Sequence, residues 1–137
     1  MTVSDTIEVG TVLPPVEITD ITRTMLALFA GASGDHNPIH IDIDFARSAG
    51  MDDVFAHGML SMAYLGRLLT NWVPQASIRS FEVRFASITP VHAAPTCTGT
   101  VVSMETVDGQ RLAHLDLLVT LPDGTVTLTG GAIVAVD

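Results

Sequence analysis

The spacing of hydrophobic residues changes once along the chain, from a helical period in the first half to alternation in the second. Before the change lies the most apolar helical segment, residues 57–72 (HGMLSMAYLGRLLTNW), where only Arg67 and Asn71 are strongly polar. A helix with so little polar surface is buried in a globular protein, and Pro74 closes this one. We therefore expect one long central helix.

Two shorter helices are predicted before the central helix, each bounded by residues that favour helix ends. In chain order these residues are Asp20, Gly31, Gly34, Asp42 or Asp44, and Gly50. The aspartates are the expected N-caps and the glycines are the expected stop signals. Residues 6–18 precede both helices, and two prolines break this segment into short extended pieces.

After the central helix the pattern is that of strands joined by tight turns. Four strands are expected, over residues 78–86, Thr96–Val107, 111–121 and 125–136. Asp108-Gly109 and residues 122–124 (PDG) are turn signals, so the last three strands form an antiparallel meander. Helices followed by strands indicate an α+β fold with one sheet, and such a sheet packs economically by curling around the long helix.

Composition and charge narrow the classes of function. Over 137 residues, 47% are hydrophobic and 15% are charged, which favours a single domain (1–137) with a large core or an apolar interface. The net charge is −9 and lysine is absent, so nucleic-acid binding is not expected. No apolar run reaches the roughly 18 residues of a membrane span, and no secretory signal is evident, so we expect a cytoplasmic protein. Cys97 is the single cysteine and is expected to be a small buried hydrophobe.

One loop, residues 29–40 (FAGASGDHNPIH), carries most of the candidate chemistry. It places Asp35 five residues before His40, and these side chains commonly move protons near neutral pH. Pro38 fixes its own φ, and Asn37 can bond to nearby backbone groups, so both are predicted to position the loop. His36, between the acid and the histidine, is expected to be a solvated or packing residue.

The start of the central helix completes the predicted site. A helix N-terminus presents N–H groups without intrahelical acceptors, and Gly58 lets a ligand approach its backbone closely. We therefore predict that the Gly58 amide is an oxyanion donor to a carbonyl group. His57 is expected to cap or orient the helix rather than to react. An acid–base pair with an oxyanion donor suits chemistry at the α and β carbons of a carbonyl compound.

A metal site is the main alternative for the loop, since Asp35, His36, His40, Asp42 and Asp44 are close together in the sequence. A helical His-x-x-x-His pair would support a zinc site, and a calcium-loop spacing would support a calcium site. His36 and His40 have the His-x-x-x-His spacing, but they lie in a predicted loop rather than in a helix, and no calcium-loop spacing occurs. We therefore predict no metal.

These motifs resemble those of the MaoC-like (R)-specific enoyl-thioester hydratases and (3R)-hydroxyacyl-thioester dehydratases. The resemblance rests on residues 33–40 (SGDHNPIH) with Ala46 beyond them, residues 57–60 (HGML), and residues 83–85 (VRF) followed by Pro90-Val91. Within the family, the length and the central helix are most similar to catalytic subunits of the mycobacterial-type (3R)-hydroxyacyl-carrier-protein dehydratases. Family members often have Gly-Asp shortly after the Pro-Val pair, where this chain has residues 92–95 (HAAP).

The resemblance implies a hot-dog fold, in which a curved antiparallel sheet wraps a long central helix, assembled as a homodimer or as a heterodimer with a related subunit. It implies enoyl or (3R)-3-hydroxyacyl thioesters of coenzyme A (CoA) or acyl carrier protein (ACP) as substrates, with no separate cofactor. By position, Asp35 and His40 become the catalytic dyad and the Gly58 amide the oxyanion donor. Met59 becomes a candidate for lining the substrate site. Arg84 is a candidate for meeting a carrier phosphate, and a rim or structural ion pair is an equal alternative.

Two other functions stay open at this point. A non-catalytic hot-dog subunit, or an acyl-thioester-binding partner within a heterodimeric dehydratase, would need neither Asp35 nor His40. A thioesterase on the same fold would have no use for this loop. Enoyl-thioester hydration, or the reverse dehydration, is therefore the leading prediction.

Overall fold

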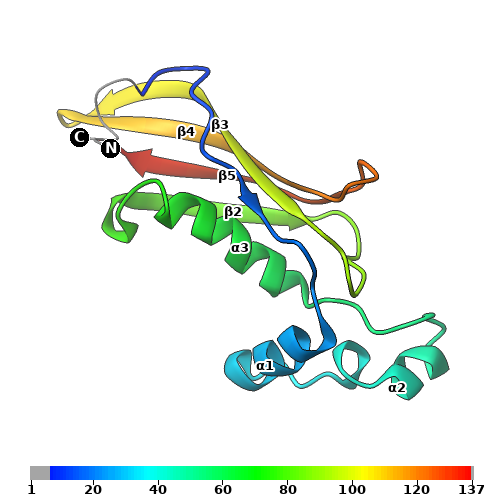
Figure 1. The fold of residues 1–137 in the computed structure, drawn as a ribbon. Coiled ribbons are helices and arrows are strands. Elements are labelled where there is room, and N and C mark those ends of the chain that lie inside the picture. Colours follow the sequence, from blue (N-terminus) through cyan, green and yellow to red (C-terminus); the bar gives the residue numbers. More distant parts are fainter. Residues whose placement is uncertain (1–6, 137) are drawn as a thin grey trace.

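The central helix expected from the sequence is α3 (Gly58–Thr70), which lies along one face of a curved sheet (Figure 1). The structure, a computed structural model, describes residues 7–136. The side chains of α3 that are buried are Leu60, Ser61, Tyr64, Leu65, Leu68 and Leu69. Burying one leucine contributes about 1.5–3 kcal/mol, so the apolar pattern of this helix is explained by its packing. Within the described residues, no helix is long and apolar enough to cross a bilayer.

The sheet confirms the predicted α+β fold and its antiparallel meander. Its strands are β1 (Val16–Glu17), β2 (Ile78–Phe85), β3 (Thr96–Val107), β4 (Gln110–Thr120) and β5 (Val126–Ala135). In the part of the chain that the structure describes, they form one antiparallel sheet in the order β1-β3-β4-β5-β2. Strands β1 and β2 are therefore its two edges. The turn predicted at Asp108-Gly109 is present, and both residues have positive φ, 51° and 78°.

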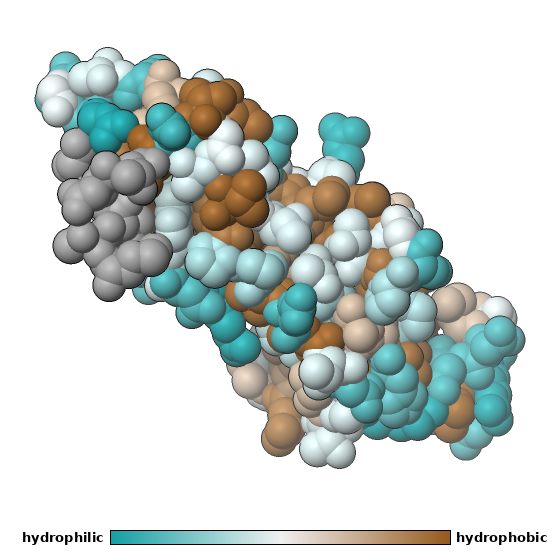
Figure 2. Space-filling view, turned by 45° about the horizontal axis from the view of Figure 1, so that its top comes forward, coloured by the Kyte–Doolittle hydropathy of each residue, from teal (hydrophilic) through white to brown (hydrophobic). Residues whose placement is uncertain are grey.

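The core lies between α3 and the inner face of the sheet. Gly99 on β3 shows how closely they approach, because a Cβ there would lie 3.1 Å from Leu117 and 3.2 Å from Leu68. Cys97 is fully buried in this core, as predicted, and burial raises the pKa of its thiol to about 11. Figure 2 shows hydrophilic residues gathered over the end of the molecule that carries α2, with apolar patches over the sheet.

The first helix, α1 (Arg23–Ser33), corrects one prediction from the sequence. Its N-cap is Thr22 rather than Asp20, because the Thr22 hydroxyl accepts the Met25 N–H at 3.1 Å in a capping box. Asp20 instead accepts a hydrogen bond from the His92 ring at 3.0 Å. The helix passes through Gly31 and ends before Gly34, which has a left-handed φ of 78° as predicted for a stop signal.

The second helix, α2 (Ile43–Ser48), settles the choice between two predicted caps. Asp42 is the N-cap, and its Oδ1 accepts the N–H groups of Asp44 at 3.0 Å and Phe45 at 3.2 Å. Gly50 follows the helix with a φ of 90°. The predicted end of this helix is therefore confirmed within two residues.

Residues 92–95 form the segment where the family that the sequence resembles often has Gly-Asp. His92 stands there with a φ of 66°, a left-handed conformation that only a few per cent of non-glycine residues adopt. Its backbone N–H donates to the Ile21 carbonyl at 2.7 Å, and its ring lies beside Asp20. Contacts with the start of α1 therefore hold this residue in a conformation that glycine adopts more easily.

Candidate active site

The loop between α1 and α2 is fixed by three successive bonds from backbone N–H groups to side chains. Ser33 Oγ accepts the Asp35 N–H at 3.2 Å, Asp35 Oδ1 accepts the Asn37 N–H at 3.3 Å, and Asn37 Oδ1 accepts the Ile39 N–H at 3.1 Å. Pro38 then begins a short 3-10 helix, η1 (Pro38–His40). The bond from the Asn37 N–H occupies Asp35 Oδ1, and Asp35 Oδ2 is the carboxylate oxygen that lies near His40. The Asn37 side chain thus bonds to the loop backbone and Pro38 begins η1, while their role in positioning the loop stays a prediction.

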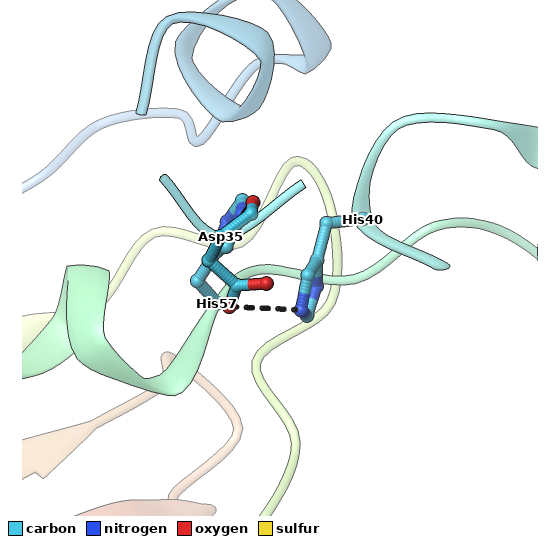
Figure 3. A group of neighbouring side chains, drawn as sticks. All are labelled: Asp35, His40 and His57. Atoms are coloured by element: carbon cyan, nitrogen blue, oxygen red, sulfur yellow. Dashed lines mark hydrogen bonds and ion pairs between the residues drawn. The ribbon is translucent and has the colours of Figure 1, made fainter. Parts of the chain in front are cut away.

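His40 lies at the end of this loop with its ring nitrogens in different environments. Nδ1 is 2.7 Å from the Phe55 carbonyl oxygen. Because a carbonyl only accepts, Nδ1 carries the proton of a neutral ring and Nε2 keeps its lone pair. Nε2 lies 3.9 Å from Asp35 Oδ2 (Figure 3). The His40 side chain is 10% exposed and that of Asp35 is 51% exposed, so the imidazole is buried and the carboxyl group is open to solvent.

His57, which sequence analysis expected only to cap or orient the helix start, makes contacts with the other site residues that the sequence did not predict. Its ring stacks on His40 with centroids 3.9 Å apart and an interplanar angle of 26°. Its Nε2–H donates to the backbone carbonyl of Asp35 at 3.2 Å. His57 occupies the N-cap position of α3, but its side chain makes no capping hydrogen bond, so the predicted capping role is wrong. Its long-range contacts have no local sequence signal.

The environment of His57 lowers the pKa of its ring, which favours the neutral form. Burial lowers the pKa of His57 most, and nearby His40 lowers it further, while the bond to the Asp35 carbonyl opposes both effects. Its Nδ1 is buried and has no hydrogen-bond partner among the described residues. A proton on Nδ1 would place a buried N–H without an acceptor there, which is costly.

Gly58 is the first residue of α3, directly after His57. Among residues 7–136, no group accepts a hydrogen bond from the Gly58 N–H, as expected for the first turn of a helix. The Phe85 ring lies against its Cα, since a Cβ on Gly58 would be 2.9 Å from two ring carbons. The amide that sequence analysis selected is therefore available, in a position where glycine admits a close neighbour.

Two open hollows flank the start of α3. The first has a volume of about 510 Å³ and is lined by Phe29, Ser33, Asp35, Met59, Met62, Ala63, Gly66 and Phe81. Asp35 is the only ionisable side chain of that lining. The second, of about 310 Å³, includes Gly58, Phe55, Phe85 and Leu128 in its lining. Asp35 and the residue with the candidate oxyanion amide, Gly58, thus line two different apolar hollows, and both hollows include residues from the start of α3.

The structure brings some predicted residues together and separates others. Met59 lines the hollow that contains Asp35 and is 54% exposed. Arg84 lies elsewhere, in a groove of about 770 Å³ that also includes Glu82 and Asp116. Its contact with a carrier phosphate therefore stays a prediction. His36 is exposed, as expected for a residue outside the acid–base pair.

A metal ion fits this group poorly for a geometric reason. Ligand atoms of Asp35, His40 and His57 all lie within 4.8 Å of one another. Imidazole binds a metal through a lone pair in the plane of its ring. Rings stacked at 26° have nearly parallel planes, so one ion cannot lie in both planes at bonding distance. The stacking favours proton chemistry over coordination.

Comparison with known proteins adds independent observations. A family model described as MaoC like domain matches residues 6–120. An (R)-specific enoyl-CoA hydratase of Rhodospirillum rubrum is 29% identical over 116 residues, which are 85% of this chain and 80% of that protein. The 3-hydroxyacyl-thioester dehydratase Z of Mycobacterium tuberculosis is 31% identical over 91 residues, 62% of this chain and 60% of that protein.

A solved structure shares the fold. The ChsH1–ChsH2 complex of Mycobacterium tuberculosis contains a chain that superposes with a TM-score of 0.79 and 23% identity, covering 93% of this chain and 97% of that one. This likeness, with the curved antiparallel sheet around α3, establishes the hot-dog architecture expected from the sequence. That structure is a complex of two differently named subunits.

Proposed function

Because the chain belongs to the MaoC-like domain family of hydratases and dehydratases, we propose that it reversibly hydrates trans-2-enoyl thioesters to (3R)-3-hydroxyacyl thioesters. In this proposal Asp35 and His40 are the catalytic dyad, and the Gly58 amide is the oxyanion donor. The acyl chain is carried on CoA or on the phosphopantetheine of ACP. No metal or separate cofactor takes part.

The observation that carries the proposal is the gap of 3.9 Å between Asp35 Oδ2 and His40 Nε2. A direct hydrogen bond is shorter, but a single water oxygen fits about 2.8 Å from both atoms. Backbone groups occupy Asp35 Oδ1 and His40 Nδ1, so the two remaining atoms are both proton acceptors. A water held there presents its oxygen to a third atom, as nucleophilic addition requires.

The proposed reaction balances with these groups alone. The water oxygen bonds to C3 of the enoyl chain while His40 Nε2 takes one of its protons. The electron pair of the double bond moves toward the thioester oxygen, where the Gly58 N–H stabilises the developing charge. The imidazolium then returns the proton to C2 on the same face, and Asp35 holds the remaining O–H. The reverse sequence dehydrates the (3R)-3-hydroxyacyl thioester.

The apolar hollow beside Asp35 supports an acyl substrate. Its volume of about 510 Å³ and its methionine and phenylalanine lining suit an aliphatic chain, and Met59 is the most exposed large hydrophobic residue in it. A charged small molecule would find only one ionisable side chain in this lining, and that side chain is an acid.

We also propose that a second hot-dog subunit, identical or related, covers this face. Apolar side chains that line the two open hollows are exposed, among them Met59 at 54% and Phe85 at 53%. Strand β2, which carries Phe85, is an edge strand with an unpaired side. A partner on this edge would close the hollows and remove the apolar surface from water.

The test is an assay of the purified protein with crotonyl-CoA, following loss of the conjugated double bond, with crotonyl-ACP as the second carrier. We expect turnover with at least one carrier. Asp35→Asn removes the charge but keeps the shape, and should lower kcat by about 10²–10⁴-fold, the usual contribution of a catalytic acid or base. Asp20→Asn is the matched control and should leave kcat unchanged.

Two results would overturn the proposal. One is a wild-type protein that is inactive with both carriers, both alone and when co-purified with a related hot-dog subunit, and the other is near-normal turnover in Asp35→Asn. The carrier that supports turnover identifies the substrate as a CoA or an ACP thioester. Sedimentation of the active species gives its mass, which shows whether one or two kinds of subunit are required.

A further inference from the structure

The proposed mechanism uses only one of the two stacked histidines. His57 is 1% exposed, its ring lies against His40 at 3.9 Å, and no step of the mechanism requires it to exchange a proton. Burying a second imidazole here costs free energy, because its Nδ1 loses its hydrogen bonds to water and has no partner among the described residues. Such a buried polar group calls for an explanation.

The first part of the explanation is the contact with Asp35. The His57 Nε2–H donates to the backbone carbonyl of Asp35, not to its carboxylate, at 3.2 Å. This bond joins the loop to the start of α3 across 22 residues of sequence. The other bonds that fix Asp35 are made within the loop itself, to Ser33 and Asn37. His57 therefore sets where the locally ordered loop lies relative to the helix.

The second part is the contact with His40. The His57 ring covers one face of His40, and Phe55 meets the same ring nearly perpendicularly, with centroids 5.0 Å apart and planes at 84°. The Phe55 carbonyl binds Nδ1 in the ring plane. These three contacts restrict rotation of the His40 ring and aim Nε2 at Asp35 Oδ2. Without His57, one face of the ring would lose its support.

The third part is electrostatic. Two ionisable residues face His57: His40, which stacks on its ring, and Asp35, whose backbone carbonyl it binds. From α1, the uncharged ring of Phe29 meets the His57 ring edge-on, with centroids 4.9 Å apart. A charged His57 would repel the imidazolium that forms on His40 during turnover. A neutral ring supports His40 without opposing that charge.

Resting on the proposed function, we propose that His57 is a positioning residue that holds both members of the Asp35–His40 dyad through one hydrogen bond and one ring stack. It touches neither water nor substrate in this role. Its removal should therefore slow the chemical step while leaving the binding of the thioester largely intact.

Two variants separate the two contacts. His57→Phe keeps a flat ring for stacking but removes the donor to the Asp35 carbonyl. His57→Gln restores an N–H donor but removes the ring. Misplacing a catalytic group by about 1 Å costs up to about a hundredfold, so we expect kcat of His57→Phe to fall by about ten- to a hundredfold. His57→Gln should recover part of this loss, and the exposed neighbour His36→Gln, as control, should match the wild type.

Two readouts distinguish positioning from a merely structural role. The dissociation constant of butyryl-CoA, an unreactive saturated analogue, should change less than threefold in His57→Phe, while kcat falls far more. Amide hydrogen exchange at Asp35 and Asn37 should become severalfold faster, because the loop loses its bond to α3. The exchange measurement needs no turnover, so it tests His57 even if the protein proves inactive on thioesters.

An unchanged kcat in both His57 variants would overturn the proposal. Parallel losses of kcat, butyryl-CoA affinity and thermal stability would also overturn it, because His57 would then serve the fold as a whole. If the wild-type protein lacks turnover, the proposed function fails, and unchanged exchange at Asp35 and Asn37 overturns the positioning role separately.

Discussion

The Asp20–His92 pair and the Asp35–His40 pair each place a carboxylate beside an imidazole, in very different surroundings. The nearest oxygen and nitrogen are 3.0 Å apart in the first pair and 3.9 Å apart in the second. Both side chains of the first pair are about half exposed, whereas the His40 side chain is only 10% exposed. By distance alone, the first pair would be taken for the stronger interaction.

The decisive difference is the state of the ring nitrogens. His92 uses both, since Nδ1 lies 3.0 Å from Asp20 and Nε2 lies 3.4 Å from the Arg23 guanidinium. Arg23 in turn pairs with Asp53, so His92 belongs to an exposed ionic network. His40 uses Nδ1 on a carbonyl and keeps Nε2 available, with a carboxylate just beyond hydrogen-bonding distance. His92 has both ring nitrogens engaged in a structural network, whereas the buried His40 ring and the exposed Asp35 carboxylate each keep one acceptor atom for a water molecule.

The largest expected effect is a loss of turnover that follows only one of the two pairs. His40→Gln and His92→Asn each replace an imidazole by an amide, and asparagine tolerates the left-handed φ at position 92. His40→Gln should lower kcat by about 10²–10⁴-fold, because the amide cannot accept a proton from water. His92→Asn should keep kcat within about twofold of the wild type. Equal losses of kcat in the two variants would contradict the proposed functional difference between the Asp35–His40 and Asp20–His92 pairs.

A second, smaller effect concerns stability in acid. Because the pKa of folded His57 is lowered, the unfolded chain binds more protons below the ordinary histidine pKa of about 6.5. Unfolding is therefore favoured as the pH falls from about 6.5 toward the lowered pKa, and the effect levels off below it. Urea unfolding at several pH values should show a smaller acid-induced loss of stability in His57→Phe than in the wild type. Parallel curves would contradict this account.

The smallest expected effect is on stability at the exposed pair. His92→Asn removes the contacts to Asp20 and Arg23, but it relieves part of the cost of a left-handed backbone. Exposed ion pairs contribute about 0–1 kcal/mol, so the net change in unfolding free energy should be within about 1 kcal/mol. Thermal unfolding at two salt concentrations would measure it. A loss well above this range would mean that the network supports the fold more than its exposure suggests.

Much of this architecture could be predicted because its signals are local. The alternation in β3 and the Asp108-Gly109 turn fix the hairpin, and the apolar run of α3 fixes the central helix. The misplaced cap of α1 has a different origin. Asp20 and Thr22 are both good caps, and the choice depends on His92, which lies 72 residues from Asp20 in the sequence. Short-range patterns hold no information about that partner.

The same limit explains the partial prediction of the site. Asp35 and His40 could be predicted as site residues because they are proton-transferring side chains only five residues apart. Asn37 could be predicted because it bonds to nearby backbone groups. The role of His57 depends on a carbonyl 22 residues away and on a ring stack between two loops. The pairing of edge strand β2 with β5 is equally long-range, so the position of the open face could not be read from the chain.

The self-contained bonding of the loop after α1 has a consequence for modularity. The side chains of Ser33, Asp35 and Asn37 each accept a backbone N–H from two residues further along the chain. The conformation of this short segment is therefore determined largely by its own residues. The base lacks this independence, because His40 is oriented by Phe55 and His57 from beyond the next helix. If this loop alone were transplanted onto another scaffold, Asp35 would keep its orientation within the loop, but the His40 ring would lose the contacts that orient it. The smallest transferable unit therefore runs from residue 33 through the first turn of α3.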